Sequence, residues 1–120
     1  MWRISDFFFS VKMWFQKVFR GYSDSEIWNL DDTIVEYVLP KLKLFRKQTI
    51  CYPPNLESFE EWENILDEII WAFEFHKSDA PFDELKEKYG DNWRDEYRKL
   101  NERYRNGLKL FGEYLGCLWW

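Results

Sequence analysis

The chain has 120 residues, a formal net charge of −5 and an aromatic content of 22%, with 8 Trp, 7 Tyr and 11 Phe. This length predicts a single domain over residues 1–120, and such an aromatic content excludes an intrinsically disordered chain. Net acidity argues against direct nucleic-acid binding, because that affinity comes largely from Lys and Arg that neutralise phosphates. The charge is uneven: residues 1–56 hold eight basic and six acidic residues, whereas residues 57–120 hold nine and sixteen.

The first predicted element is an amphipathic helix over about residues 5–19, which Gly21 should end in a left-handed conformation. Its apolar stripe at helical spacing consists of Phe7, Val11, Trp14, Phe15 and Val18. Lys12, Gln16 and Lys17 interrupt the apolar run well short of the roughly 20 residues that a membrane span needs, so we expect no span. We expect the stripe to pack on a core. The alternative is a helix lying at a membrane surface, with Trp and Phe on one face and Lys and Arg on the other.

Residues 20–33, RGYSDSEIWNLDDT, join this helix to the next one. Ser23 with Glu26 three residues later predicts a capping box that starts a short helical turn. Asp31 or Asp32 is expected to cap the helix that follows. Capping therefore explains most of this segment, and the alternative is a ligand-binding role.

The middle of the chain predicts two helices separated by a loop. The first contains Pro40, which should kink or divide it, and Pro53 and Pro54 indicate the loop. Ser58 with Glu61 predicts a second capping box. The core stripe of the second helix consists of Trp62, Ile65, Leu66, Ile69 and Phe73. Its opposite side is acidic and carries Glu60, Glu63, Asp67 and Glu74.

The last part of the chain predicts two more helices. A helix should begin near Ser78, Asp79 and Pro81, and Gly90 with Asp91 should end it and cap the next. The apolar stripe of the final helix consists of Trp93, Tyr97, Leu100, Tyr104, Leu108, Phe111, Leu115 and Leu118.

The final helix contains Gly107, which should permit a close helix crossing, and we expect the terminal Trp119 and Trp120 to dock on the core. No segment of useful length alternates with period two. The sequence therefore predicts an all-α fold, a compact bundle of four or five helices with one kinked at Pro40.

Few residues offer catalytic or metal-binding chemistry. His76 is the single histidine, and Cys51 and Cys117 have no nearby Cys or His in sequence, so neither a zinc site nor a disulfide framework is expected. A carboxylate site for Mg²⁺ or Ca²⁺ formed by Glu63, Asp67 and Glu74 is the alternative to a solvated face. Phosphate-loop and nucleophile motifs are absent, so we expect no cofactor and no enzymatic activity. Two cysteines without such a framework favour a reducing cytoplasm.

Four segments, RGYSDSEIWNLDD, LPKLKLF, WENILDEIIWAFE and GLKLFGEYLGCLWW, resemble a family of small, mostly uncharacterised bacteriophage proteins. The matching positions are Arg20, Gly21, Tyr22, Ser23, Asp24, Trp28, Leu30, Asp31, Leu39, Pro40, Leu42, Lys43, Phe45, Trp62, Ile70, Trp71, Ala72, Phe73, Glu74, Gly107, Leu108, Leu110, Phe111, Tyr114, Leu118 and Trp119. The resemblance covers most of the chain outside residues 77–103. It implies a phage gene product in the cytoplasm of a bacterial host and supplies no catalytic residues.

These observations favour a non-enzymatic phage accessory protein that binds and inhibits a host protein, such as a defence component. Large aromatic residues that the helical stripes do not absorb indicate association with a partner. The expected partner-binding residues are Glu60, Glu63, Asp67, Glu74 and Trp71. Their negative charge would suit a basic surface that normally holds nucleic acid.

The alternative function is a small-ligand binder that sequesters a nucleotide signal. The expected ligand-binding residues in that case are Arg20, Tyr22, Trp28 and Arg46, because Arg suits phosphate and aromatic rings stack on bases. A homodimer through the aromatic residues of the first helix is a further hypothesis, since symmetric dimers are common.

Overall fold

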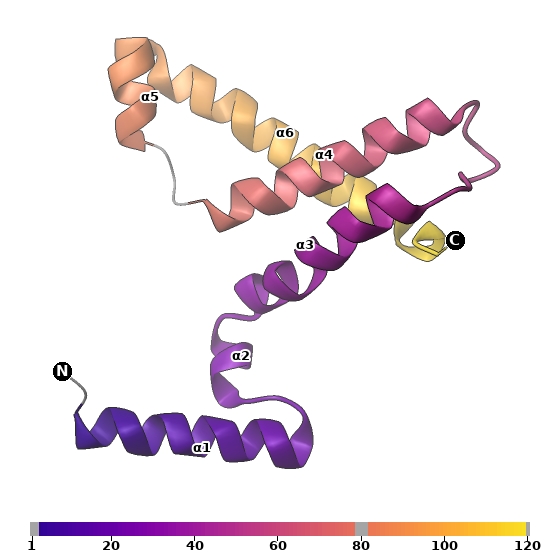
Figure 1. Ribbon diagram of the computed structural model, residues 1–120. Coiled ribbons are helices and arrows are strands. Elements are labelled where there is room, and N and C mark those ends of the chain that lie inside the picture. The colour runs from indigo at the N-terminus through magenta and orange to yellow at the C-terminus, as the bar shows by residue number, and fades with distance from the viewer. Residues whose placement is uncertain (1–2, 79–81, 120) are drawn as a thin grey trace. The chain divides into compact units, whose positions relative to one another are not determined.

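The computed structural model describes residues 3–78 and 82–119 and is built from helices (Figure 1). The α-helices are α1 (Ile4–Arg20), α2 (Asp24–Trp28), α3 (Leu30–Gln48), α4 (Phe59–Lys77), α5 (Phe82–Tyr89) and α6 (Trp93–Tyr114). Two 3₁₀ turns, η1 (Gly90–Asn92) and η2 (Leu115–Cys117), flank α6. The described residues contain no strand, so the all-α prediction is confirmed. The five helices of eight residues or more match the predicted four or five, and α2 is the predicted short turn.

The structure divides into two compact units, residues 1–34 and residues 35–120. The boundary falls inside α3, between Ile34 and Val35. The smaller unit, here called the N-terminal unit, contains α1, α2 and the first turn of α3. The larger one, the C-terminal unit, contains the rest of the chain.

The hydrophobic core belongs to the C-terminal unit. Its buried members are Val35, Leu39, Leu42, Leu56, Trp62, Leu66, Ile69, Phe73 and Tyr114. The predicted stripe of α4 is therefore confirmed, with Ile65 packed against the core at its edge. Ala72, which the stripe did not include, is fully buried as well.

Helices α4 and α6 lie side by side in the C-terminal unit (Figure 1). A Cβ atom added at Gly107 of α6 would lie 2.4 Å from Cβ of Ala72 and 2.8 Å from the carbonyl oxygen of Glu68. The predicted close crossing at Gly107 is therefore confirmed. Helix α5 packs on α6 through Phe82, whose ring contacts those of Trp93 and Tyr97 at centroid distances of 5.7 and 5.0 Å.

The ends of several helices differ from the prediction. Asp31 and Asp32 lie in the first turn of α3 rather than at its cap, because α3 begins at Leu30. Two carboxylates in the first turn still favour the helix, since they lie near the positive end of its dipole. Asp91 lies inside η1, and Asn92 is the residue that precedes α6.

Other local predictions have mixed outcomes. Helix α3 runs through Pro40 without a break, so the proline does not divide it. Ser58 caps α4 by accepting a hydrogen bond from the Glu61 amide at 3.2 Å, but the Glu61 carboxylate accepts from the amide of Glu57 instead of Ser58. The predicted docking of Trp119 is wrong, because this side chain is 74% exposed.

Three predicted residues, Asp79, Pro81 and Trp120, lie outside the described residues.

Candidate interaction surface

Helix α1 has one apolar side that its own unit leaves uncovered. At 100° per residue, eight apolar residues of α1 fall within an arc of about 140°. They are Ile4, Phe7, Phe8, Val11, Trp14, Phe15, Val18 and Phe19, and we call them the α1 apolar face. No residue of α1 is buried, and exposure reaches 65% at Phe8, 60% at Trp14 and 80% at Phe19. Within the N-terminal unit, therefore, the stripe does not pack on a core.

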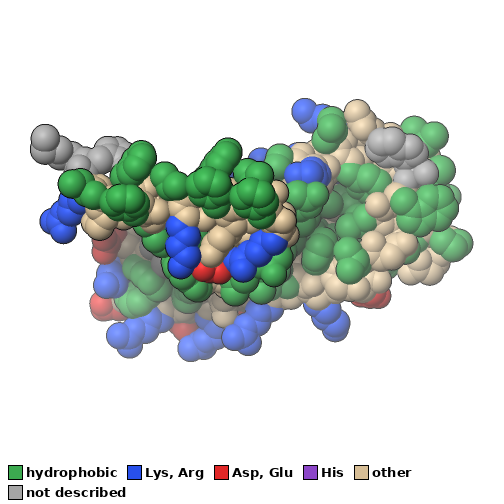
Figure 2. Space-filling view, turned by 90° about the horizontal axis from the view of Figure 1, so that it is seen from below, with side chains coloured by type: hydrophobic (Ala, Val, Ile, Leu, Met, Phe, Trp, Pro, Cys, Tyr) green, Lys and Arg blue, Asp and Glu red, His purple; other side chains and the backbone are tan. Residues whose placement is uncertain are grey.

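Figure 2 shows hydrophobic side chains gathered in a row along α1, with lysine, arginine and acidic side chains beside the row. Five of the eight residues in the α1 apolar face are aromatic. Burying a large apolar side chain contributes about 1.5–3 kcal/mol of stabilising free energy. Covering the α1 apolar face would therefore contribute several kcal/mol. A shallow hollow on it is lined by Phe7, Ser10, Val11, Trp14 and Phe15.

The reason for this exposure is that α2 is attached to the polar side of α1. The side chain of Gln16 donates to the Asp24 carboxylate at 2.8 Å and accepts from the Asp24 amide at 2.8 Å. Arg20 donates to the same carboxylate at 2.5 Å. Lys17 lies 3.7 Å from the carboxylate of Glu26.

These hydrogen bonds change the acidity of Asp24. The bond from Gln16, followed by the bond from Arg20, holds the pKa of Asp24 below its usual 3.8. The carboxylate is therefore ionised at neutral pH and can anchor α2 through charge-assisted bonds, which are stronger than neutral ones.

The geometry that links α1 to α2 follows from residues 20–26. Gly21 has φ 85°, the left-handed conformation that lets the chain turn back, so its predicted role is confirmed. The predicted capping box is also present, since the Ser23 amide donates to Glu26 at 2.7 Å. One aromatic residue of α1 contributes to the junction: Phe9 stacks on Trp28 with ring centroids 5.9 Å apart.

The residues expected to bind a nucleotide are largely engaged within the chain. Arg20 lies over the ring of Tyr22 at 4.4 Å and bonds to Asp24. Arg46, in the C-terminal unit, donates to Asp67 at 2.9 Å and to Glu63 at 2.7 Å. The hydrogen bond to Asp67 is the main reason why the pKa of Arg46 is raised.

The acidic side of α4 is paired with bases of α3. Besides the contacts of Arg46 with Glu63 and Asp67, Lys43 lies 2.7 Å from the carboxylate of Glu74. Glu60 is exposed at the start of α4. The sequence did not indicate these pairs, because Lys43 and Arg46 lie on a different helix, 17 to 31 residues before their partners.

Trp71, the aromatic member of the expected partner site, is half-buried. Its ring stacks on Phe75 with centroids 5.2 Å apart, and the Arg103 guanidinium lies 4.0 Å from its centroid. Arg103 also donates to both oxygens of Glu68, and the bond to Glu68 raises the pKa of Arg103. Trp71 therefore joins α4 to α6, and it is one of the more enclosed tryptophans.

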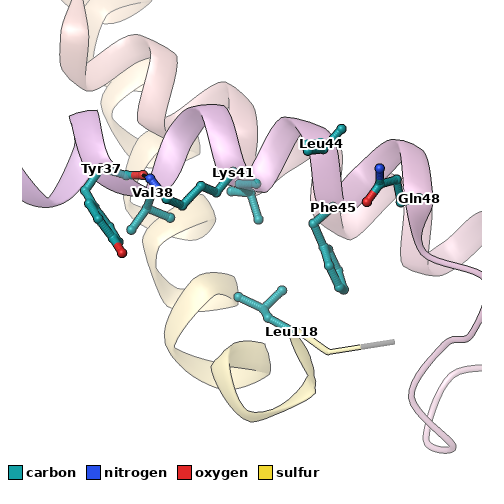
Figure 3. A pocket seen from close by; sticks show the side chains of 8 residues that line it. Tyr37, Val38, Lys41, Leu44, Phe45, Gln48 and Leu118 are labelled. Atoms are coloured by element: carbon teal, nitrogen blue, oxygen red, sulfur yellow. Dashed lines mark hydrogen bonds between the residues drawn. The ribbon is translucent and has the colours of Figure 1, made fainter.

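The C-terminal unit also has an apolar hollow of about 350 Å³ along α3. In Figure 3, Phe45 of α3 points towards Leu118 of the C-terminal segment, and Val38 and Lys41 line the same hollow. It contains little that would bind a phosphate or carry out a reaction, since Lys41 is its single charged residue.

Comparison with known protein families, with curated proteins and with solved structures finds no match to this chain. Among the described residues, no helix is both long enough and apolar enough to cross a membrane.

Sequence reasoning found five residues of the α1 apolar face and left out Ile4, Phe8 and Phe19. A complete helical projection would have included all three. It also missed Gln16 as the residue that bonds to Asp24, for which the sequence carries no signal.

Proposed function

We propose that this protein is a non-enzymatic binding protein that attaches to a partner through the α1 apolar face. The observation that carries the proposal is the exposure of five aromatic and two aliphatic side chains on one side of a single helix, with Val11 partly exposed between them. Contiguous apolar patches of this kind mark interaction sites on soluble proteins. Aromatic side chains are also those that contribute most to binding energy.

The acidic side of α4 gives weaker support to a binding role. Glu63, Asp67 and Glu74 already have basic partners on α3, so less of their charge is left to attract a basic surface. Inhibition of a host protein, which the resemblance to phage proteins suggests, would on this view use α1 in preference to α4.

A photo-reactive residue tests the proposal in cells that express the full chain. We expect benzoyl-phenylalanine in place of Phe15 to form adducts with molecules outside the chain, because Phe15 lies in the middle of the α1 apolar face. The matched control places the same residue at Ser5, which is exposed on the polar side of α1. Equal adducts from both positions, or adducts confined to the chain itself, would refute the proposal.

A further inference from the structure

The geometry points to a lipid bilayer containing anionic phospholipid as the surface that the α1 apolar face contacts, with α1 lying flat in the headgroup region. This inference rests on the proposed function and names the partner. It concerns attachment at the surface only, since no described helix could cross a membrane.

The first argument is the width and composition of the face. A seam between two paired helices is narrow and is filled by Leu, Ile or Val at alternating spacings of three and four. The α1 apolar face covers about 140° of the helix, and Phe7, Phe8, Trp14, Phe15 and Phe19 make up most of it. A second helix would cover only part of such an arc, whereas a bilayer surface covers all of it. Trp is favoured at the depth of lipid headgroups, and helices that lie at a membrane surface carry Trp, Phe and Leu on their apolar side.

The second argument is charge. Residues 3–20 contain four basic residues, Arg3, Lys12, Lys17 and Arg20, and one acidic residue, Asp6. Lys12 falls about 20° from Phe19 on the helical projection, at one edge of the apolar arc. A long basic side chain at that edge can keep its stem on the apolar surface while its ammonium group reaches lipid phosphates.

The ion pairs on the polar side leave this charge accessible. Lys12 and Lys17 lie 3.9 Å from Asp24 and 3.7 Å from Glu26, and both lysine side chains are about two-thirds exposed. Exposed ion pairs of this kind contribute little to the free energy of folding. A lysine can therefore leave its carboxylate partner and contact a lipid phosphate at small cost in free energy. With Asp24 and Glu26 included, residues 3–28 still have more basic than acidic residues, four against three.

The third argument is the direction in which α1 is attached. The chain turns back at Gly21 and bonds to the polar side of α1 through Gln16 and Asp24. In a water-soluble unit the apolar side of a helix normally faces the chain's own core. Here the N-terminal unit holds the helix by its polar side and presents the apolar side outward, which is the orientation that an interfacial helix requires.

Flotation of the full chain with lipid vesicles tests the inference. We expect the chain to float with vesicles of phosphatidylcholine mixed with phosphatidylglycerol. Binding to vesicles of phosphatidylcholine alone should be at least about fivefold weaker. This is the loss in affinity expected when about one basic residue no longer contacts an anionic surface. Phe15→Ala and Phe15→Asp should each weaken binding roughly tenfold or more, because one ring is lost from the apolar surface. The alanine variant retains a strong helix former, and circular dichroism would show that α1 still forms.

The matched control is Tyr37→Asp, which removes an exposed ring of α3 and adds the same charge outside α1; it should bind as the unmodified chain does. Absence of flotation, or flotation that both Phe15 variants leave unchanged, would overturn the inference. A mass that doubles with concentration and is halved by Phe15→Asp, without flotation, would identify a second copy as the partner. In that case, or if Phe15 photo-crosslinks to a protein, the inference fails while the proposed function stands. If neither crosslinks nor flotation is found, both fail.

Discussion

Among the glycines of the C-terminal unit, Gly107 is the one whose Cβ position has neighbouring atoms within 4 Å. A methyl group at this position would meet Cβ of Ala72 at 2.4 Å and the backbone of Glu68 at 2.8 Å. We therefore expect Gly107→Ala to lower the free energy of unfolding by about 1–3 kcal/mol, as overpacking does. Gly112 lies on the same helix with no neighbour near its Cβ position. Gly112→Ala should be neutral or stabilise by up to about 1 kcal/mol. Urea denaturation measures the unfolding free energy of both variants. Equal changes in the two variants would contradict the close approach of α6 to α4 at Gly107.

A second residue-scale prediction compares two leucines. Leu66 of α4 is fully buried in the core, whereas Leu44 of α3 is 53% exposed. Leu66→Ala should cost about 2–5 kcal/mol of unfolding free energy, because it removes buried methyl groups and leaves a cavity. Leu44→Ala should cost about 0.5 kcal/mol or less. Denaturation curves of the two variants would disprove this core assignment if the order were reversed.

At the residue scale the sequence predicted what local chemistry decides. Gly21, the Ser23–Glu26 box and the crossing at Gly107 depend on backbone conformation or on the absence of a side chain, and all three were found. The caps expected at Asp31 and Asp91 failed, because several polar residues in a row can each begin a helix. The ion pairs of Lys43 and Arg46 join separate helices, and no local pattern determines which helices become neighbours.

At the scale of the element, the apolar periodicity of α1 predicts the helix itself but not which of its sides is covered. The pattern identified an amphipathic helix and placed it to within one residue at each end. It could not say which side α2 would occupy, since the same apolar pattern suits a helix that faces a core and one that faces a membrane. The side is determined by Gln16 and Asp24, which bond to each other across the turn at Gly21.

The attachment of α2 to α1 should depend on pH through Asp24. Its pKa is lowered in the folded chain relative to 3.8, chiefly by the bond from Gln16. A lowered pKa means that this contribution is fully present above about pH 4 and is lost as the pH falls through the folded pKa. Gln16→Ala should therefore move the pKa of Asp24 upwards, towards 3.8. Carbon-detected NMR titration of the Asp24 carboxyl group measures the change, with Gln48→Ala as a control. An unaltered value in Gln16→Ala would show that the two side chains are not bonded.

At the scale of the whole molecule, the buried core and the α1 apolar face belong to different units of the chain. Every member of the buried core cluster lies between Val35 and Tyr114. In the N-terminal unit, the described residues include a single buried one, Ser23, which is polar. Composition alone could not reveal this division, because aromatic residues are plentiful in both units. Trp62 and Phe73 of α4 and Tyr114 of α6 belong to the buried core, whereas no residue of α1 is buried.

This division predicts that truncation can separate folding from attachment to vesicles. A chain that begins at Asn29 keeps all of α3 and the whole core cluster, so we expect it to unfold cooperatively with a thermal midpoint within a few degrees of the full chain. It lacks the α1 apolar face and should no longer float with anionic vesicles. Calorimetry and flotation on the same preparation measure both properties. A truncated chain that does not fold would show that the N-terminal unit supports the core, and one that still floats would place the attachment surface elsewhere. Phe15→Asp in the full chain provides the comparison, since it should match the truncated chain in flotation while leaving every core residue in place.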